Sequence, residues 1–251
     1  MPPLSTSSLK PLVVIPARMA STRLPGKPLA DIGGDPMIVH VWRRACEADL
    51  GPVVVACSEQ TVAEVIEKNG GTALLTDPNL PSGSDRVWQA VQSFDPHAQY
   101  THIINVQGDL PTLEPKTLKD ALRPLHDKAV DIATLAVEIQ DYEECNNPNI
   151  VKVVTGLEKQ PGSIARALYF TRSPAPYGAG PFWHHVGLYA YRRDALERFV
   201  TLPPSLLEQR EKLEQLRALE HHMRIDCINV ATAPLGVDTP QDLEKARALL
   251  S

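Results

Sequence analysis

The stretch from Val13 to Leu29 reads VVIPARMASTRLPGKPL and joins a short apolar run to a cationic loop. Val13, Val14 and Ile15 favour a buried strand, and Pro16 is expected to end it because proline has no backbone donor for a sheet ladder. The loop that follows carries three cations among small and turn-forming residues, namely Arg18, Arg23 and Lys27. Such a loop suits a polyphosphate, since backbone N–H groups can approach the oxygens while Arg and Lys neutralise their charge.

A second interpretation of this loop stays open, because a solvated basic loop after a first strand contains the same residue types. The stretch is also no established phosphate loop. It has neither the G-x-x-x-x-G-K-[ST] pattern of the Walker type nor the G-x-G-x-x-G pattern of dinucleotide sites.

Strands and helices alternate through the first half of the chain. Asp35-Pro36 is expected to start a helix with apolar residues at helical spacing, and Ser58 to cap a second one. Between them, residues 53–57 read VVVAC, a run typical of a strand covered on both faces. With a further strand at 72–75, the β-α-β-α-β order predicts a parallel sheet with right-handed crossovers. Ligands of such sheets bind at the carboxyl ends of the strands, where the cationic loop lies.

The second half is richer in strands and in Pro, Asn and Gly. We expect a polar helix over residues 206–219 and a closing helix with Thr239 as its cap and Pro240 at its first position. The strands predict a β-rich insertion that covers the cleft or a subunit interface, and they are expected at 132–137, 150–154, 167–170, 186–191 and 225–230.

Composition excludes several classes of protein. The chain has 251 residues with a formal net charge of −5, which argues against a nucleic-acid binder. Apolar runs stay below the roughly 20 residues that span a bilayer, and residues 1–10 lack the pattern of a secretory signal, so we expect a frayed start. Four cysteines are expected to be reduced small hydrophobic residues of a cytoplasmic protein rather than disulfides or zinc ligands; they are Cys46, Cys57, Cys145 and Cys227.

Two further segments offer candidate site residues, each with a structural alternative. Ser82, Gly83 and Ser84 open a helix, so they present free N–H groups to an anion, or they simply cap the helix. Asp109 follows the strand at 102–106 in a Gly-Asp-Leu-Pro turn. Such an aspartate can hold Mg²⁺ in a nucleotide site, or it can bond its own backbone. The sequence contains no Ser-His-Asp or Cys-His set at a recognisable spacing, so no protein nucleophile is expected.

At this point the motifs are similar to a known family. The sequence resembles the 3-deoxy-manno-octulosonate (KDO) cytidylyltransferases, the CMP-KDO synthetases of bacterial lipopolysaccharide assembly, over nearly the whole chain after residue 11. Related sugar nucleotidyltransferases share parts of the first motif. The resemblance rests on PAR-x-x-STRLPGKPL at 16–29, MIVHV at 37–41, SGSDR at 82–86, NVQGD at 105–109, NPN-x-VKVV at 147–154, ALYF at 167–170, LEQLR at 213–217 and GVDTP at 236–240.

The resemblance implies a fold and an activity. The fold is a three-layer α/β/α, Rossmann-like nucleotidyltransferase with a mostly parallel mixed sheet and a β-rich insertion, in one domain over residues 11–251. The activity couples CTP to the 2-hydroxyl of KDO with Mg²⁺ and gives CMP-KDO and pyrophosphate. The family further implies a cytoplasmic homodimer that binds neither nucleic acid nor membrane.

The resemblance also assigns roles to residues. Catalytic roles fall to Arg18, Lys27, Asp109 and Asp238, with both aspartates holding Mg²⁺. The nucleotide site comprises Ala17, Arg18, Arg23, Lys27, Ser82, Gly83 and Arg86. The sugar-acid pocket comprises Arg172, His185, Tyr189, Glu208 and Glu211. One position departs from the family, because many members have glutamate where this chain has Leu110. Either that glutamate is not needed for the chemistry, or this branch supplies its role differently.

Two other functions stay open at this point. One is a sibling cytidylyltransferase that acts on another sugar acid, such as a sialic acid or an amino-substituted KDO. The other is a nucleotide-binding sensor or scaffold that has lost catalysis. The second predicts CTP binding without pyrophosphate release, and a pure binder has no need of both magnesium carboxylates.

Overall fold

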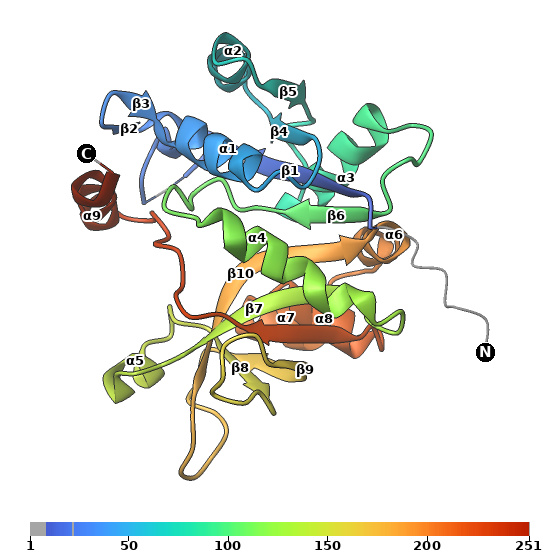
Figure 1. The fold of residues 1–251 in the computed structure, drawn as a ribbon, viewed down its shortest axis with the longest axis vertical. Helices are drawn as coiled ribbons and strands as arrows, with labels where there is room; N and C mark the ends of the chain where they lie inside the picture. Colours follow the sequence, from blue (N-terminus) through green and yellow to red (C-terminus); the bar gives the residue numbers. More distant parts are fainter. Residues whose placement is uncertain (1–8, 22, 251) are drawn as a thin grey trace.

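A nine-stranded sheet forms the centre of the molecule, and most of the helices pack against it (Figure 1). The structure, a computed structural model, describes residues 9–21 and 23–250. The frayed start expected over residues 1–10 falls mostly on residues outside these ranges. The strands of this sheet are β1 (Pro11–Ala17), β4 (Val53–Cys57), β5 (Thr72–Leu75), β6 (His102–Asn105), β7 (Ile132–Glu138), β8 (Lys152–Thr155), β9 (Ile164–Thr171), β10 (Trp183–Arg192) and β11 (Ile225–Asn229).

The strand order is β5-β4-β1-β6-β10-β7-β11-β9-β8. The first four strands are parallel, as expected, and β7 and β11 are parallel to each other. The sheet is mixed, as predicted, but fewer of its strand pairs are parallel than expected, because β10 is antiparallel to β6 and β7, and β9 is antiparallel to β8 and β11. Antiparallel pairs need only short loops, and the segments between β8, β9 and β10 contain no crossover helix.

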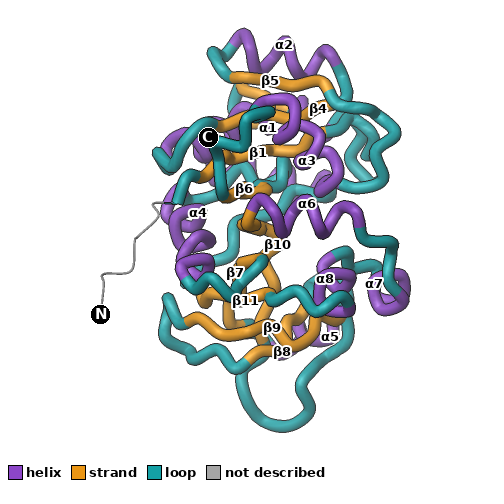
Figure 2. The backbone as a smooth tube through the Cα atoms, turned by 90° about the vertical axis from the view of Figure 1, so that its right-hand side faces the viewer, coloured by secondary structure: helices purple, strands orange, loops and turns teal. Residues whose placement is uncertain are grey.

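The β-rich second half closes on itself. Besides its pairs with β6 and β7, β10 pairs with β8 at His184 and Lys152. The five strands β10, β7, β11, β9 and β8 therefore form a small barrel that continues the parallel half of the sheet. Figure 2 shows this stack of strands from the side, with the barrel at the end opposite α2.

Helices cover both faces of the sheet because side chains alternate along its strands. Val13 and Ile15 pack on one face and Leu12 and Val14 on the other, all fully buried. The first face is covered by α1 (Met37–Glu47), α2 (Gln60–Lys68) and α4 (Pro115–Leu122). The second is covered by α3 (Gly83–Phe94), α6 (Arg193–Thr201) and α8 (Gln215–Glu220).

The remaining elements lie at the edges of this core. A two-stranded sheet consists of β2 (Asp31–Ile32) and β3 (Asp35–Pro36), and α9 packs against it. The other helices are α5 (Tyr142–Asn146), α7 (Leu206–Glu211), α9 (Pro240–Leu250) and the 3-10 turns Lys27–Leu29 and Arg123–His126. Within the described residues, no helix is long and apolar enough to cross a membrane.

Three local predictions were wrong. Asp35-Pro36 forms β3 instead of starting α1, because the chain pairs back on Asp31 and Ile32 before the helix begins. Ser58 does not cap α2, whose first turn follows Glu59 without a side-chain cap. The polar helix expected over 206–219 is two helices, because Lys212 adopts a left-handed conformation with φ of 57° between α7 and α8.

Pro16 also differs from its prediction, because it lies inside β1 and pairs with Ala56 of β4. Successive residues of a strand direct their N–H and C=O groups to alternate sides. The Val14 carbonyl accepts from Val106 on the β6 side, so the missing donor of Pro16 also faces that side, beyond the end of β6. A proline at this position therefore removes no hydrogen bond between strands.

Candidate active site

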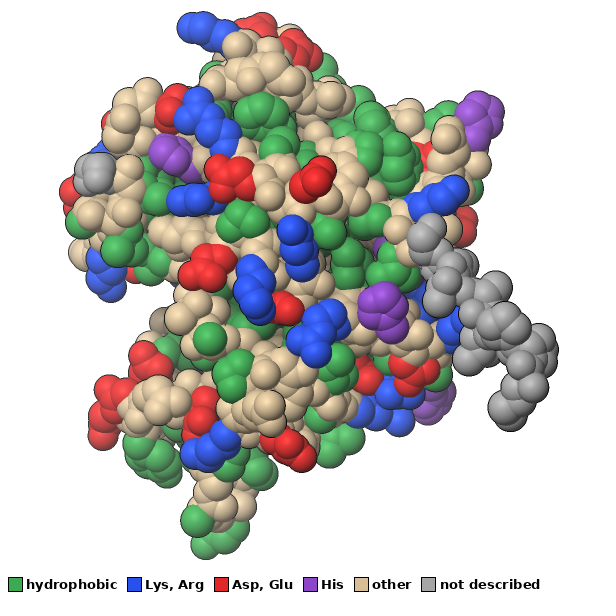
Figure 3. Space-filling view, viewed as in Figure 1, with side chains coloured by type: hydrophobic (Ala, Val, Ile, Leu, Met, Phe, Trp, Pro, Cys, Tyr) green, Lys and Arg blue, Asp and Glu red, His purple; other side chains and the backbone are tan. Residues whose placement is uncertain are grey.

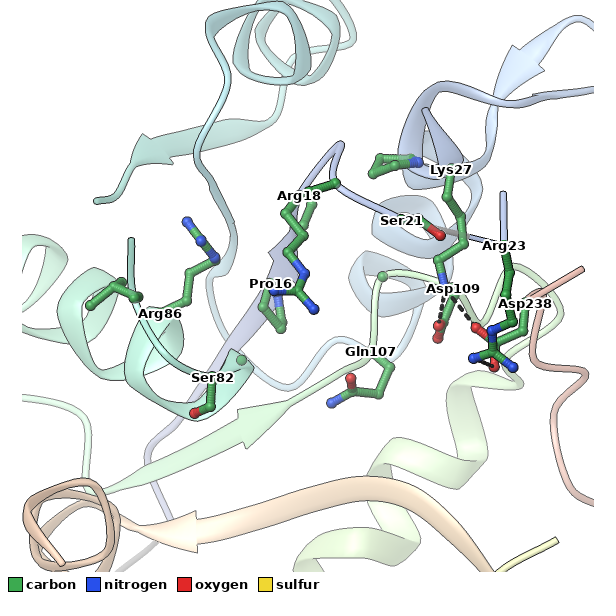
Figure 4. A pocket seen from close by; sticks show the side chains of 16 residues that line it. Pro16, Arg18, Ser21, Arg23, Lys27, Ser82, Arg86, Gln107, Asp109 and Asp238 are labelled. Atoms are coloured by element: carbon green, nitrogen blue, oxygen red, sulfur yellow. Dashed lines mark hydrogen bonds and ion pairs between the residues drawn. The ribbon is translucent and has the colours of Figure 1, made fainter. Parts of the chain in front are cut away.

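A cavity of about 370 Å³ lies where β1 and β6 end, at the carboxyl edge of the parallel strands (Figure 4). Four segments line it: the loop after β1, the loop before α3, the turn after β6 and the segment before α9. The cationic loop thus lies where the parallel topology predicts a ligand. The lining residues are Pro16, Ala17, Arg18, Ala20, Ser21, Arg23, Lys27, Pro28, Leu80, Ser82, Gly83, Arg86, Gln107, Gly108, Asp109 and Asp238.

One side of the cavity holds a cluster of opposite charges. The Lys27 ammonium donates to Asp109 at 2.6 Å and to Asp238 at 3.0 Å, and Arg23 pairs with the second oxygen of Asp238 at 3.0 Å. Burial alone would lower the pKa of Lys27, but the charges and hydrogen bonds of Asp109 and Asp238 outweigh burial and raise it. Lys27 therefore stays protonated at neutral pH. The two predicted metal ligands, Asp109 and Asp238, lie close together here although they are far apart in sequence.

A backbone hydrogen bond fixes the two aspartate turns to each other. The Val237 N–H donates to the Asp109 carbonyl at 2.9 Å. Directly after Asp238, the Thr239 hydroxyl accepts from the Asp242 N–H, so Thr239 caps α9 as expected. The separation of the carboxylates of Asp109 and Asp238 is therefore set by main-chain geometry and by helix capping.

Leu110 is part of this support. Its side chain is only 7% exposed and belongs to the core beneath α1 and α4. A Cβ atom added at Gly236 would lie 3.9 Å from Leu110, so the leucine lies beside the segment that carries Asp238. Because the side chain at position 110 points into this core and away from the cavity, an apolar residue at this position is compatible with the site.

Gly108 is required because the turn after β6 passes very close to β1. A Cβ atom at this position would lie 2.8 Å from the Pro16 carbonyl oxygen and 3.3 Å from Ile38. We expect Gly108→Ala to destabilise the fold by about 1–3 kcal/mol and to displace Asp109. Urea unfolding and turnover measure both effects. Gly156→Ala, with nothing within 4 Å of the added atom, is the matched control and should change neither. Equal stability of both variants would contradict this packing.

On the other side of the cavity, two guanidinium groups form no ion pair with any carboxylate of residues 9–21 and 23–250. Within the described residues, Arg18 makes no hydrogen bond or ion pair, and it lies over the middle of the cavity (Figure 4). Arg86 is only 3% exposed, and its guanidinium donates to the Thr76 hydroxyl. Burial, with a smaller effect of nearby Arg18, lowers the pKa of Arg86. Two cations that form no ion pair with a carboxylate in the described part of the chain favour an anionic ligand.

The segment before α3 both caps the helix and lines the cavity, so the two interpretations of it are compatible. The Ser82 hydroxyl accepts from the Asp85 N–H at 3.2 Å and donates to its carboxylate at 2.6 Å, so it caps the helix. Ser82 and Gly83 also line the cavity, together with Arg86 from the first turn of the helix. The N-terminus of this 12-residue helix thus adds a positive partial charge to the site.

The residues predicted for the sugar acid lie outside the cavity lining. Glu208 forms an ion pair with Arg217 at 2.6 Å. Glu211 accepts from the Thr171 hydroxyl and the Arg172 backbone, and the Arg172 guanidinium donates to carbonyls of Pro148 and Glu211. Glu208 thus joins α7 to α8, whereas Glu211 and Arg172 join the end of β9 to α7, and the role of these three residues in sugar binding stays a prediction.

The last two predicted sugar residues lie on β10. His185 is buried between Phe170 and Tyr189, at 3.0 Å from the Thr134 hydroxyl, and burial lowers its pKa to about 3. Tyr189 pairs in register with Asn105, the final residue of β6. Tyr189 therefore lies beside the end of β6, opposite a residue that is two positions before the cavity-lining Gln107.

The predictions missed several residues in or near the cavity. Gln107 and Ser21 line the cavity, and both belong to sequence motifs quoted for other residues. Glu214 is a buried carboxylate behind Ser84, whose hydroxyl donates to it at 3.2 Å, while its second oxygen has no partner in the described ranges. Burial raises the pKa of Glu214. The sequence feature that could have identified Glu214 is its position in the LEQLR motif at residues 213–217.

Charge, fold and cavity together define a nucleotidyltransferase. Residues 12–225 match the family described as cytidylyltransferase. A relative from Paramagnetospirillum magneticum, a 3-deoxy-manno-octulosonate cytidylyltransferase, is 62% identical over 97% of this chain and 99% of its own. Another, from Parvibaculum lavamentivorans, is 64% identical over 96% of this chain and 93% of its own. The chain belongs to the 3-deoxy-manno-octulosonate cytidylyltransferase family, which confirms the resemblance.

Solved structures agree with this assignment. A CMP:2-keto-3-deoxy-manno-octonic acid synthetase in complex with CTP superposes with a TM-score of 0.87 at 41% identity, covering 96% of this chain and 98% of that chain. A 4-diphosphocytidyl-2C-methyl-D-erythritol synthase from Anaerococcus prevotii has a TM-score of 0.64 at 11% identity, over 96% and 98% of the two chains, which shows a shared fold alone.

Proposed function

We propose that the cavity at the ends of β1 and β6 transfers CMP from CTP to the 2-hydroxyl of KDO, giving CMP-KDO for lipopolysaccharide synthesis and releasing pyrophosphate. One observation carries this proposal. The same cavity contains two guanidinium groups that form no carboxylate ion pair within the described residues, Arg18 and Arg86, and two aspartates that converge on Lys27. Family membership supports the choice of both substrates.

The reaction must overcome repulsion between anions. The hydroxyl of an acidic sugar attacks the α-phosphate of a nucleotide with four negative charges, so the cavity must first neutralise part of that charge. We assign Ser82, Gly83 and Arg86 to the cytidine end, and Arg18, Arg23 and Lys27 to the triphosphate. Arg18 and Lys27 then stabilise the pyrophosphate that leaves, and positioning of the reactants in line supplies the rest.

Asp109 and Asp238 fit a magnesium ion. Each has an oxygen within 3.0 Å of the same nitrogen, so both reach one point. Mg²⁺ typically takes one or two carboxylates and completes its shell with substrate phosphates and water. The described residues hold no cluster of three or more metal-ligating side chains, so the protein alone does not enclose the ion. Bound there, Mg²⁺ would polarise the phosphoryl oxygen and lower the pKa of the attacking hydroxyl.

The side chains of the cavity otherwise bind and orient. None of its lining residues forms a base-activated nucleophile, which supports direct transfer without a covalent enzyme intermediate. The homodimer and the cytoplasmic location implied by the resemblance stay predictions.

A pyrophosphate-release assay tests the proposal. With CTP, Mg²⁺ and KDO together we expect turnover, and omission of any one should abolish it. A panel of sialic acid and amino-substituted KDO separates this activity from that of a sibling enzyme, which would prefer another acid. CTP binding without pyrophosphate release on any acid would instead support the sensor or scaffold and overturn the proposal.

A further inference from the structure

Lys27 occupies the point that the two metal-binding aspartates share. Its ammonium lies 2.6 Å from Asp109 and 3.0 Å from Asp238, and the side chain is only 17% exposed (Figure 4). The same residue faces the cavity in which the triphosphate is placed under the proposed function. Lys27 thus has two possible sets of anionic partners, the carboxylates and the phosphates.

We propose that Lys27 is a positioning residue that makes metal binding at Asp109 and Asp238 depend on the nucleotide. A divalent ion shared by both carboxylates must lie where the ammonium lies, and two cations cannot share that point. The metal therefore enters only when Lys27 leaves, and triphosphate oxygens give the ammonium its alternative partner. This inference rests on the proposed function, because it assumes that these aspartates are the metal ligands.

The surroundings of Lys27 allow this exchange. It begins a short 3-10 turn directly after Gly26, whose φ of 69° places the loop in a left-handed conformation. The carboxylates, in contrast, are fixed by the Val237 to Asp109 backbone bond. When the long lysine side chain swings, the two ligands can therefore stay in place. Nucleotide and metal binding then strengthen each other by the same factor.

Arg23 has a smaller part in this competition. It pairs with the other oxygen of Asp238 and makes no contact with Asp109, and both partners are largely exposed. An exposed ion pair of this kind contributes little to the free energy of the site. Removal of Lys27, in preference to Arg23, should therefore release the metal site.

Direct titration of Mn²⁺, followed by its electron paramagnetic resonance signal, tests the inference without turnover. In the absence of nucleotide, we expect Lys27→Met to bind Mn²⁺ at least tenfold more tightly than the wild-type chain, and Lys27→Gln to behave alike. Mn²⁺ alone should also raise the melting temperature of these variants more than that of the wild type. A merely structural lysine would not give tighter metal binding when it is removed.

Two controls make the result specific. Lys245→Met removes a cation from α9, where Lys245 lies 3.9 Å from Asp242, and should leave Mn²⁺ affinity unchanged. Adding Asp109→Asn to Lys27→Met should abolish the gain. Equal Mn²⁺ affinity, within twofold, of folded Lys27 variants and the wild type would overturn the inference. The proposed function fails separately, if Asp109→Asn leaves turnover unchanged.

Discussion

Replacement of Asp109 by Asn should lower kcat roughly 1,000-fold, equivalent to about 4 kcal/mol of transition-state stabilisation. The substitution keeps the size of the side chain but removes the negative charge that makes it a magnesium ligand. It also leaves the Lys27 ammonium with one carboxylate instead of two. Steady-state pyrophosphate release with CTP, KDO and Mg²⁺ measures the effect.

The fold should survive this substitution. The Asp109 carbonyl, which accepts from Val237, is unchanged, and the asparagine amide still fits the turn. We therefore expect a melting temperature within a few degrees of the wild type. Asp49→Asn is the matched control, since Asp49 lies in an exposed turn with a φ of 50°, which asparagine tolerates. Near-normal turnover of Asp109→Asn, at any melting temperature, would end the metal assignment.

The first half of the fold was predictable because its signals are local. A run such as VVVAC, buried on both faces between β1 and β5, is typical of a parallel strand, and the helices between strands force crossovers. The pairing of β10 with β6, β7 and β8 depends on contacts between distant segments, so the barrel could not be deduced. The same holds for Asp35-Pro36, where a pair of short strands overrides a helix-start signal.

The charged part of the site was predictable for a related reason. Arg18, Lys27 and Asp109 lie in the loops that follow two parallel strands, whose ends must meet at one edge, and the resemblance adds Asp238. The residues predicted to bind the sugar acid could not be assigned in this way, because glutamate and arginine side chains are common both in ligand binding and in structural ion pairs. Only coordinates reveal that Glu208 is paired with Arg217, or that Glu214 is a buried carboxylate with an unpaired oxygen.

Lys152 provides the second large effect, this time on stability. The side chain is fully buried, and its ammonium donates to the carbonyls of Asn147, Ile150 and Arg172 at 3.0, 2.6 and 2.6 Å. All three ammonium protons thus have an acceptor. Burial lowers the pKa of Lys152, and no carboxylate forms an ion pair with it in the described part of the chain.

Lys152→Met should lower the free energy of unfolding by about 3 kcal/mol. Methionine fills a similar volume, but three part-buried carbonyls lose their donor, at a cost of up to about 1–3 kcal/mol each. Relief from burying a charge offsets part of this loss. Urea unfolding measures the difference. Lys159→Met, which removes only an exposed pair with Glu138, should change stability by less than about 1 kcal/mol. Equal effects of the two substitutions would show that the carbonyls around Lys152 find other partners, and that this lysine does not hold the 147–150 turn against the end of β9.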